Sequence, residues 1–540
     1  MQTIAKRTTG WALMETLRNY GVDTVFGIPG THNIELYRPL STLGIRAVTS
    51  RHEQGAGYAA DGWSLRSGKP GVVMTTSGPG LLNALSAAAT AYCESRPMIL
   101  IAPGPSRGSE FADVGVLHET RDQLGAAAAV VEWARRVQSS EEAVQAVHDA
   151  FELFATGRPR PVYIELPVDV LEEISELPDT ALAARHVETP PLQNPEALTQ
   201  AAALLDAAMA PVILAGGGSR HAAAEVRAVA ERLGAPVVTT LNAKGVLDEH
   251  HPLSLGSNLR LAAARNRARD ADVLLVVGSK LGEAELWVDQ LEARGTVIRI
   301  DVLETQLAKN QAVDVGIVGD AKIALTALLA ELGAGEGRAA TASVAQTLTE
   351  VRDESARLSP GNHAIAEAIV AALPEHAIVS TDSSQIAYWG LLNHLAVAEP
   401  NSVLYMATYA TLGYGLPAAL GANIATPERP AVLVTGDGAL MFSINEFITV
   451  IEQRADVTVI VVDNGGYAEI KQNELDAGIA PVGVDLAQPD WVKTVEAFGG
   501  TGARAVSRSD LAAALEKAVG AGGLQLIHID QATFDAGADS

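Results

Sequence analysis

The clearest indication of the fold is the segment Ala431-Val432-Leu433-Val434-Thr435-Gly436-Asp437-Gly438. In it, a short apolar, β-branched run is followed directly by a glycine-rich turn. Residues 457–462 form a second apolar segment, which ends at Asp463-Asn464-Gly465-Gly466-Tyr467. Apolar runs of this length predict buried strands, and helical spacing begins between them near Ser443. Both turns should therefore lie at the carboxyl ends of neighbouring parallel strands, where open α/β sheets bind ligands.

The same alternation of strand and helix continues through the whole chain in three blocks. Residues 80–92 and 141–155 have helical spacing between predicted strands, and polar or small-residue segments at 176–196 and 333–342 indicate linkers. The sequence predicts three doubly wound parallel-sheet α/β domains at 1–175, 190–335 and 355–535. The predicted strands are 72–76, 98–102, 162–166, 212–215, 236–240, 273–278, 297–301, 377–380, 431–435, 457–462 and 524–529.

Composition excludes several classes of function. The chain has 540 residues, 39 Lys+Arg against 64 Asp+Glu, and a net charge of −25, which opposes binding to nucleic acid or to anionic membranes. Its single cysteine, Cys93, excludes an internal disulfide framework and a multi-cysteine zinc site. We find no apolar signal core and no bilayer-length apolar run, so we expect a soluble, cytoplasmic protein with no nucleic-acid or membrane partner.

The two turns carry oxygen atoms suited to a hard cation. Asp437 offers a carboxylate, Asn464 an amide oxygen and Gly466 a backbone carbonyl, while the glycines allow a phosphate to approach closely. Such ligands suit Mg²⁺ holding a diphosphate. Taken alone, however, each turn could simply cap a strand.

The spacing of Gly-Asp-Gly, 25 residues and then Asn resembles the diphosphate signature of thiamine diphosphate (ThDP) enzymes. The resemblance extends in order over nearly the whole chain, and it points to the group of acetolactate synthases, pyruvate oxidases and 2-oxoacid decarboxylases. It implies a pyrimidine-binding, a central and a diphosphate-binding domain. The other matching segments are Phe26-Gly27-Ile28-Pro29-Gly30, Arg51-His52-Glu53-Gln54-Gly55-Ala56, Ala59-Ala60-Asp61-Gly62, Thr76-Ser77-Gly78-Pro79-Gly80 with Asn83, His251-Pro252-Leu253 and Leu412-Gly413-Tyr414-Gly415-Leu416-Pro417-Ala418-Ala419.

The resemblance assigns roles to particular residues. Glu53 would protonate the cofactor's pyrimidine ring, which lets the cofactor's own imine act as base. The carbonyl of Ala410 would accept from the 4′-amino group, and Leu412 would wedge the two rings into a bent conformation; acetolactate synthases usually have Gly and Met there. The implied cofactor-binding residues are Pro29, Glu53, Asn83, Ser384, Gln385, Ala410, Leu412, Gly436, Asp437, Gly438, Ala439, Asn464, Gly466, Tyr467 and Ala468; the implied metal ligands are Asp437, Asn464 and Gly466.

Two histidines are candidates for proton transfer near the reacting carbon. His52 and His118 would act on the substrate carboxylate and on the intermediate, so the implied catalytic residues are Glu53, His52 and His118. The alternatives are that His52 orients neighbours in a polar loop and that His118 faces solvent.

Two features distinguish the chain from typical acetolactate synthases. In flavin-binding members, one sequence element follows His-Pro-Leu and another follows the next strand. This chain lacks the first at 255–260 and the second at 278–283, so we do not expect FAD. The segment 117–123 and the run Gly466-Tyr467-Ala468-Glu469-Ile470 resemble 5-guanidino-2-oxopentanoate (2-ketoarginine) decarboxylases. We therefore assign Glu469, Ile470 and His118 to the substrate, since a carboxylate at 469 would attract a cationic tail. Alternatively, Glu469 interacts only with a helix dipole.

These observations predict a ThDP- and Mg²⁺-dependent enzyme that decarboxylates a 2-oxoacid without oxidation. The alternative is carboligation of acetolactate synthase type, in which a second carbonyl compound captures the intermediate. Retention of Glu53, Asp437 and Asn464 argues against a non-catalytic paralogue. In the superfamily, the first and third domains of different subunits share one cofactor, so we expect a homodimer or a dimer of dimers.

Overall fold

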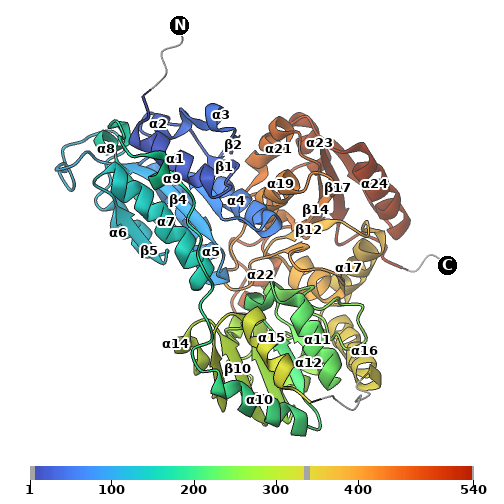
Figure 1. Cartoon of the computed structure of the whole chain (residues 1–540). Helices are drawn as coiled ribbons and strands as arrows, with labels where there is room; N and C mark the ends of the chain where they lie inside the picture. Colours follow the sequence, from blue (N-terminus) through green and yellow to red (C-terminus); the bar gives the residue numbers. More distant parts are fainter. Residues whose placement is uncertain (1–5, 334–340, 538–540) are drawn as a thin grey trace.

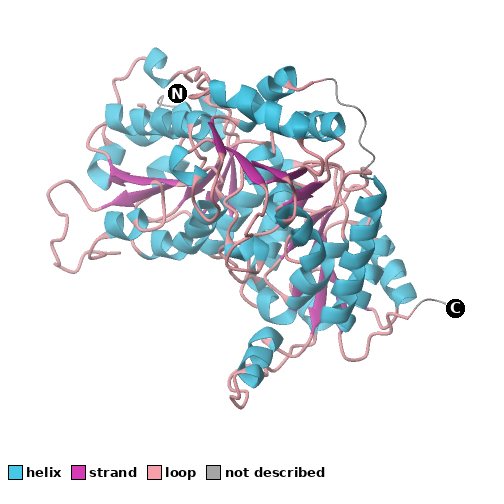
Figure 2. Cartoon of the chain, turned by 90° about the horizontal axis from the view of Figure 1, so that it is seen from below, coloured by secondary structure: helices cyan, strands magenta, loops and turns pink. Residues whose placement is uncertain are grey.

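A computed structural model describes residues 6–333 and 341–537. The chain forms three α/β domains, each built on one parallel sheet with helices on both faces (Figures 1 and 2). The first and third domains lie beside one another in Figure 1, and the central domain lies below both. No helix in the described ranges is long and apolar enough to cross a bilayer.

The first domain has six strands in the order β2-β1-β3-β4-β6-β5, all parallel. Its strands are β1 (Thr24–Gly27), β2 (Arg46–Thr49), β3 (Gly71–Met74), β4 (Met98–Gly104), β5 (Trp133–Arg136) and β6 (Val162–Pro167). Its helices are α1 (Thr9–Asn19), α2 (Ile34–Tyr37), α3 (Leu40–Leu43), α4 (Glu53–Ser67), α5 (Pro79–Glu94), α6 (Gln123–Ala128), α7 (Ser140–Thr156) and α8 (Val168–Glu172).

The central domain has five parallel strands in the order β11-β10-β9-β7-β8. The strands are β7 (Val212–Ala215), β8 (Val237–Thr239), β9 (Val273–Val277), β10 (Thr296–Asp301) and β11 (Val315–Val318). The helices are α10 (Glu196–Ala207), α11 (Ala223–Leu233), α12 (Ala262–Arg269), α13 (Glu283–Leu286), α14 (Glu304–Leu307) and α15 (Ala321–Glu331), with 3₁₀ turns η1 (Gly217–Ser219) and η2 (Leu241–Ala243). Helix α16 (Thr341–Leu358) also packs here, through Val344 and Val351.

The third domain has six parallel strands in the order β13-β12-β14-β15-β17-β16. The strands are β12 (Ile378–Thr381), β13 (Val403–Leu404), β14 (Ala431–Gly436), β15 (Val457–Asp463), β16 (Thr501–Arg504) and β17 (Leu524–Asp530). The helices are α17 (Pro360–Ala372), the π-helix η3 (Ala387–Leu391), α18 (Leu392–His394), α19 (Gly415–Ala425), α20 (Asp437–Leu440), the 3₁₀ turn η4 (Ile444–Glu446), α21 (Phe447–Gln453), α22 (Ala468–Asp476), α23 (Trp491–Ala497) and α24 (Arg508–Ala521).

The predicted fold class is confirmed, and all the predicted strands are present with small shifts in their ends. One local expectation differs. The helical segment after Gly436-Asp437-Gly438 starts at Asp437 itself as the short α20, and α21 begins only at Phe447. The first predicted linker, 176–196, contains the short helix α9 (Asp179–Leu182), and most of the second, 333–342, lies outside the described residues.

Two of the motifs quoted from the sequence meet where the first and third domains join. Helix α4 packs against α19 so closely that a Cβ on Gly62 would lie 2.2 Å from the carbonyl oxygen of Ala418. Below this contact, the Tyr414 hydroxyl donates to Asp61 Oδ2 at 2.8 Å, and the buried Arg96 also pairs with Asp61. This junction fixes the start of α4 relative to the loop that precedes α19.

Candidate active site

Three oxygen atoms converge at the carboxyl ends of β14 and β15. These strands pair in parallel, with Gly436 opposite Val462, so the turns that follow them lie side by side. The side-chain amide of Asn464 lies 3.2 Å from Asp437 Oδ1 and 3.1 Å from the Gly466 carbonyl oxygen. We call these three residues, Asp437, Asn464 and Gly466, the Asp437 cluster.

The chemistry of the Asp437 cluster fits a divalent cation. The amide oxygen of Asn464 faces these two acceptors, an arrangement that is repulsive unless a cation sits between them or the amide turns to donate. Asp437 is 1% exposed, and its Oδ2 has no hydrogen-bond partner among the residues that the structure describes. Burial raises the pKa of Asp437 to about 6, and the nearby charge of Asp463 adds to this rise. A carboxylate, an amide oxygen and a carbonyl are the hard ligands that Mg²⁺ takes.

Close backbone packing brings other predicted residues to the same place. A Cβ on Gly436 would lie 3.1 Å from Ser384 Cβ, and one on Gly438 would lie 2.9 Å from the Tyr467 ring. Gly466 has φ +138°, and a Cβ there would lie 2.1 Å from the Val484 carbonyl oxygen, so only glycine fits. Ala439 lies within α20, and Ala468 is the first residue of α22.

Asp382 forms hydrogen bonds to the loop before α19, which was predicted to contact the pyrimidine ring. Its carboxylate accepts from the backbone N–H of Gly413 at 3.0 Å and of Gly415 at 2.8 Å. Ala410 has φ +51°, a conformation that costs a non-glycine residue roughly 1–2 kcal/mol. Leu412 is half-buried next to it. The left-handed backbone explains why Gly is usual at position 410 in the acetolactate synthases.

Glu53 lies at the first position of α4, in the first domain. It is 8% exposed, and Asn83 Nδ2 donates to its Oε2 at 3.0 Å. His52 is exposed and caps the helix, because its Nδ1 accepts from the Gln54 N–H at 3.2 Å. Pro29 is exposed on the loop after β1.

No sequence motif indicated Glu446, a residue of the third domain that holds the turn leading into α4. Its carboxylate accepts from the backbone N–H of Arg51 at 3.0 Å and of His52 at 3.1 Å. Burial raises the pKa of Glu446 above its usual value, while Thr449 and these backbone donors lower it. The side chain thereby orients the turn that presents Glu53.

His118 lies against the end of β3 rather than in open solvent. Its Nδ1 is 3.4 Å from Thr76 Oγ1 and 3.5 Å from Ser77 Oγ. His32, which sequence reasoning missed, stacks edge-to-face on His118 with ring centroids 5.2 Å apart, and its Nδ1 lies 2.6 Å from Ser77 Oγ. Burial, followed by the charge of His118, lowers the pKa of His32. We call Glu53, Asn83 and His118 the Glu53 cluster.

The Glu53 cluster and the Asp437 cluster belong to different domains of the chain. Within residues 6–333 and 341–537, no hydrogen bond or ion pair joins a member of one cluster to a member of the other. The described part of the chain therefore holds the two clusters apart from one another.

Comparison with known proteins decides the family. A family model for the "Thiamine pyrophosphate enzyme, N-terminal TPP binding domain" matches residues 7–126, the central-domain model matches 198–328, and the "C-terminal TPP binding domain" model matches 382–529. The chain is 37% identical to "Probable 2-ketoarginine decarboxylase AruI" of Pseudomonas aeruginosa, over 98% of this chain and 95% of that one.

The chain belongs to the thiamine pyrophosphate enzyme family.

Acetolactate synthases are also similar to this family member. The isozyme 1 large subunit of Escherichia coli is 32% identical over 87% of this chain and 84% of its own length. The large subunit of Parasynechococcus marenigrum is 31% identical over 94% of this chain and 85% of its own length. Thiamine pyrophosphate is another name for ThDP, so the suspected superfamily is confirmed, while the reaction stays undecided between the two groups.

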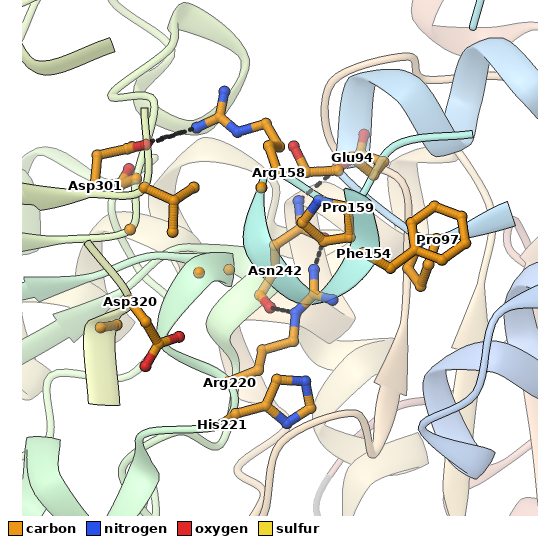
Figure 3. Close-up of a pocket in the computed structure, with 18 of the residues that line it drawn as sticks. Glu94, Pro97, Phe154, Arg158, Pro159, Arg220, His221, Asn242, Asp301 and Asp320 are labelled. Atoms are coloured by element: carbon orange, nitrogen blue, oxygen red, sulfur yellow. Dashed lines mark hydrogen bonds and ion pairs between the residues drawn. The ribbon is translucent and has the colours of Figure 1, made fainter. Parts of the chain in front are cut away.

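A cavity of about 790 Å³ lies between the first and central domains of this thiamine pyrophosphate enzyme (Figure 3). It opens at the carboxyl ends of β7, β9 and β10, near the point where the strand order reverses. Several polar groups on its wall are bonded to each other: Arg158 pairs with Asp301 at 3.2 Å, the Asn242 side-chain amide donates to Glu94, and Arg220 Nε donates to the Asn242 backbone carbonyl at 2.8 Å. The prediction that FAD does not bind here stays a prediction.

Two of the three predicted substrate residues, Glu469 and Ile470, lie on the first turn of α22, whereas the third, His118, belongs to the first domain. Glu469 is half-buried and accepts a hydrogen bond from Gln385 Nε2 at 2.9 Å. Gln385, which was predicted to contact the diphosphate, therefore bonds to a predicted substrate residue. Ile470 is 51% exposed. Helix α22 has no buried residue, which leaves its apolar side chains open to a further partner or ligand.

Proposed function

We propose that this protein is a ThDP- and Mg²⁺-dependent decarboxylase of 2-oxoacids, whose substrate has a cationic tail such as that of 5-guanidino-2-oxopentanoate. The observation that carries the proposal is the convergence of oxygens in the Asp437 cluster beside the glycine turns of a TPP-binding domain. When bound, ThDP supplies a nucleophilic carbon that attacks the 2-oxoacid carbonyl and takes up the electrons released with CO₂.

The Asp437 cluster would hold the magnesium ion. Asp437 provides the negative charge, and Asn464 and Gly466 provide neutral oxygens, so the ion keeps enough positive charge to bind a diphosphate. Gly436 and Gly438 leave room for the phosphates to approach the backbone, with Ser384 beside them. Occupation by a cation would also remove the repulsion that now surrounds the Asn464 oxygen.

Glu53 would hold and deliver a proton at the far end of the cofactor. Its neighbour Asn83 donates to Oε2, which fixes the carboxyl group while leaving Oε1 for the ligand. His118 lies close enough to Thr76 and Ser77 to be fixed in position, and it would move a proton at the substrate. His52 caps α4, and this supports the alternative that it orients its neighbours.

A homodimer would bring the two half-sites together. The Glu53 and Asp437 clusters are separate within one chain, and both are bordered by exposed apolar side chains of the kind that interfaces bury. The exposed side chains near the clusters are Leu82, Tyr409, Met441, Phe442, Ile470 and Leu475. A second copy that covered them would complete two sites across a twofold axis.

The named relatives support decarboxylation and leave carboligation as the second candidate. The 37%-identical relative is named as a 2-ketoarginine decarboxylase, and several others are named as acetolactate synthases. The carboxylate of Glu469 favours a cationic tail over pyruvate. Both reactions release CO₂, but only carboligation joins the acyl unit to a second carbonyl compound.

The deciding experiment is to incubate the purified protein with ThDP, Mg²⁺ and a panel of 2-oxoacids, and to measure CO₂ release and product masses. We expect one aldehyde per CO₂, with 4-guanidinobutanal as the best product. A 2-hydroxy-2-acyl acid as the main product would favour the acetolactate synthase reaction instead. No CO₂ from any 2-oxoacid would contradict the proposed function.

A further inference from the structure

The surroundings of Glu469 contain a group of aromatic residues that the sequence motifs did not single out. Trp389 Nε1 donates to Glu469 Oε2 at 3.3 Å, alongside the bond from Gln385. Tyr388 lies next to both: burial and then the charge of Glu469 raise the pKa of its phenol. The carboxylate is thus held in one orientation by neutral donors and bordered by two aromatic rings.

Glu469 has no cationic partner in the parts of the chain that the structure describes. None of its contacts there is an ion pair, although its side chain is half-buried. A carboxylate offers about four lone-pair sites, and the donors from Gln385, Trp389 and the Tyr388 phenol use three of them. A partly buried charge without a counter-ion is unfavourable unless something else neutralises it.

The aromatic rings form a continuous cluster around this carboxylate. Trp389 contacts Trp287 of the central domain edge-to-face, with centroids 4.7 Å apart, and Tyr388 lies 6.0 Å from Trp389. The three rings contact one another edge-to-face, and Tyr388 and Trp389 are only half-buried, so part of each of these two side chains stays accessible. The guanidinium of Arg260 already lies 5.0 Å from the Trp287 ring, so this cluster accepts a stacked guanidinium elsewhere.

The backbone has an uncommon conformation in both segments that carry these aromatic residues, the one at Tyr388 and Trp389 and the one at Trp287. Tyr388 and Trp389 belong to the π-helix η3, and π-helical turns are frequent at functional sites. Trp287 has φ +56°, which is rare for a bulky residue and is kept only where the surrounding structure enforces it. Trp389 thus donates to the carboxylate, and Trp287 of the central domain packs against Trp389 and Tyr388.

We propose that Trp389 and Tyr388 complete, together with Glu469, a recognition site for a planar, delocalised cation at the far end of the substrate. The inference rests on the proposed function and deepens it by naming the residues that set its substrate class. Glu469 supplies the opposite charge, and the indole N–H of Trp389 fixes the carboxylate. The rings provide faces on which a guanidinium stacks; because a guanidinium is flat and weakly hydrated, it gains more from such a surface than an ammonium does.

The test compares two substrates of nearly the same shape. In 5-guanidino-2-oxopentanoate the terminal group is a cation, and in 5-ureido-2-oxopentanoate it is neutral and also planar. The readout is kcat/KM for the guanidino substrate divided by kcat/KM for the ureido substrate, measured on full-length enzyme with ThDP and Mg²⁺. Effects on folding or cofactor loading cancel in this ratio.

We expect Glu469→Gln to lower this ratio by about ten- to a hundredfold, as a lost charge-assisted bond would. Trp389→Leu should lower it by about three- to thirtyfold, the range of a cation–π contact, and Trp389→Phe, which keeps a ring but loses the N–H, should lower it less. Asp476→Asn makes the same charge change on the exposed end of α22 and should leave the ratio unchanged.

A binding measurement provides a second readout that does not need turnover. Titration with 4-guanidinobutanoate should quench tryptophan fluorescence in the wild type and in Trp133→Phe, which lies on β5, but much less in Trp389→Phe. An unchanged substrate ratio in Trp389→Leu, together with unchanged quenching in Trp389→Phe, would overturn the inference. A wild type that decarboxylates 2-oxohexanoate but shows no preference for the guanidino substrate would overturn the inference and leave decarboxylation standing. Absence of CO₂ from every 2-oxoacid would instead overturn the proposed function.

Discussion

Replacing Asp437 by Asn should make the empty protein more stable at neutral and higher pH, while it weakens the binding of the cofactor. Asp437 is almost fully buried, and its pKa is raised from 3.8 to about 6. A folded-state pKa above the unfolded value means that the folded chain binds the proton more tightly. The unfolding free energy of the empty protein therefore falls as pH rises from about 4 to about 6, and it stays lower above that range.

The size of the effect follows from this shift. A shift of about two pKa units corresponds to about 3 kcal/mol, and screening by water that enters the site reduces this to about 1–3 kcal/mol. At pH 8, Asp437→Asn should thus make the empty protein more stable, because an uncharged amide replaces a buried charge. At pH 4 the difference should vanish, because Asp437 is then protonated.

Saturating ThDP and Mg²⁺ should reverse the order of stability. The wild type gains about 2.7 kcal/mol at a ligand concentration of a hundred times Kd, whereas the variant lacks the charged ligand and should gain little. The assay is thermal unfolding at pH 4 and pH 8, with and without cofactor. The sign of each change in Tm is the readout, since a three-domain chain need not unfold in two states. A variant that is less stable than wild type when empty at pH 8, or that gains as much from the cofactor, would refute the reasoning.

Three further predictions concern the rest of the molecule. Glu53→Gln should still bind ThDP, but exchange of the cofactor's C2 proton with deuterated solvent should slow by about 10²–10⁴-fold; wild-type exchange by NMR would rule out Glu53 as the proton donor. Mixing the inactive chains Glu53→Gln and Asp437→Ala should restore part of the activity through heterodimers, and no recovery despite demonstrated heterodimers would place the whole site within one chain. Burial raises the pKa of Glu285 to about 7. The unfolding free energy of the wild type should therefore fall by up to about 3 kcal/mol as pH rises from 4.5 to 7. Glu285→Gln should remove that fall, and parallel curves of Tm against pH for the two proteins would contradict the prediction.

The fold could be predicted from the sequence for most of the buried strands, although the buried β1, only four residues long, does not stand out. Strands such as β4 and β15 are covered on both faces, so they consist of continuous apolar runs that stand out from the helices. The edge strands β2, β5 and β16 are partly exposed and contain arginine or glycine, so no such run marks them. Strand β13 has only two residues, which is too short for any pattern to indicate.

The candidate site could be predicted where backbone geometry requires particular residues. Gly436 and Gly438 stand where neighbouring side chains leave little room for a Cβ, so the motif marks the place directly. Glu446 and Trp389 left no such mark. Glu446 bonds to a backbone N–H 395 residues away, and Trp389 bonds to a carboxylate 80 residues away, so only the folded chain brings these partners together.

The first and third sheets repeat one design, because each orders its own six strands second, first, third, fourth, sixth and fifth. A duplicated domain would produce this arrangement, with each copy later acquiring different loops at the same edge of its sheet. One copy would now hold the proton donor and the other the cation ligands. Evolution could then alter the loop after β15, and with it the preferred substrate tail, while the proton donor on the other copy stays untouched.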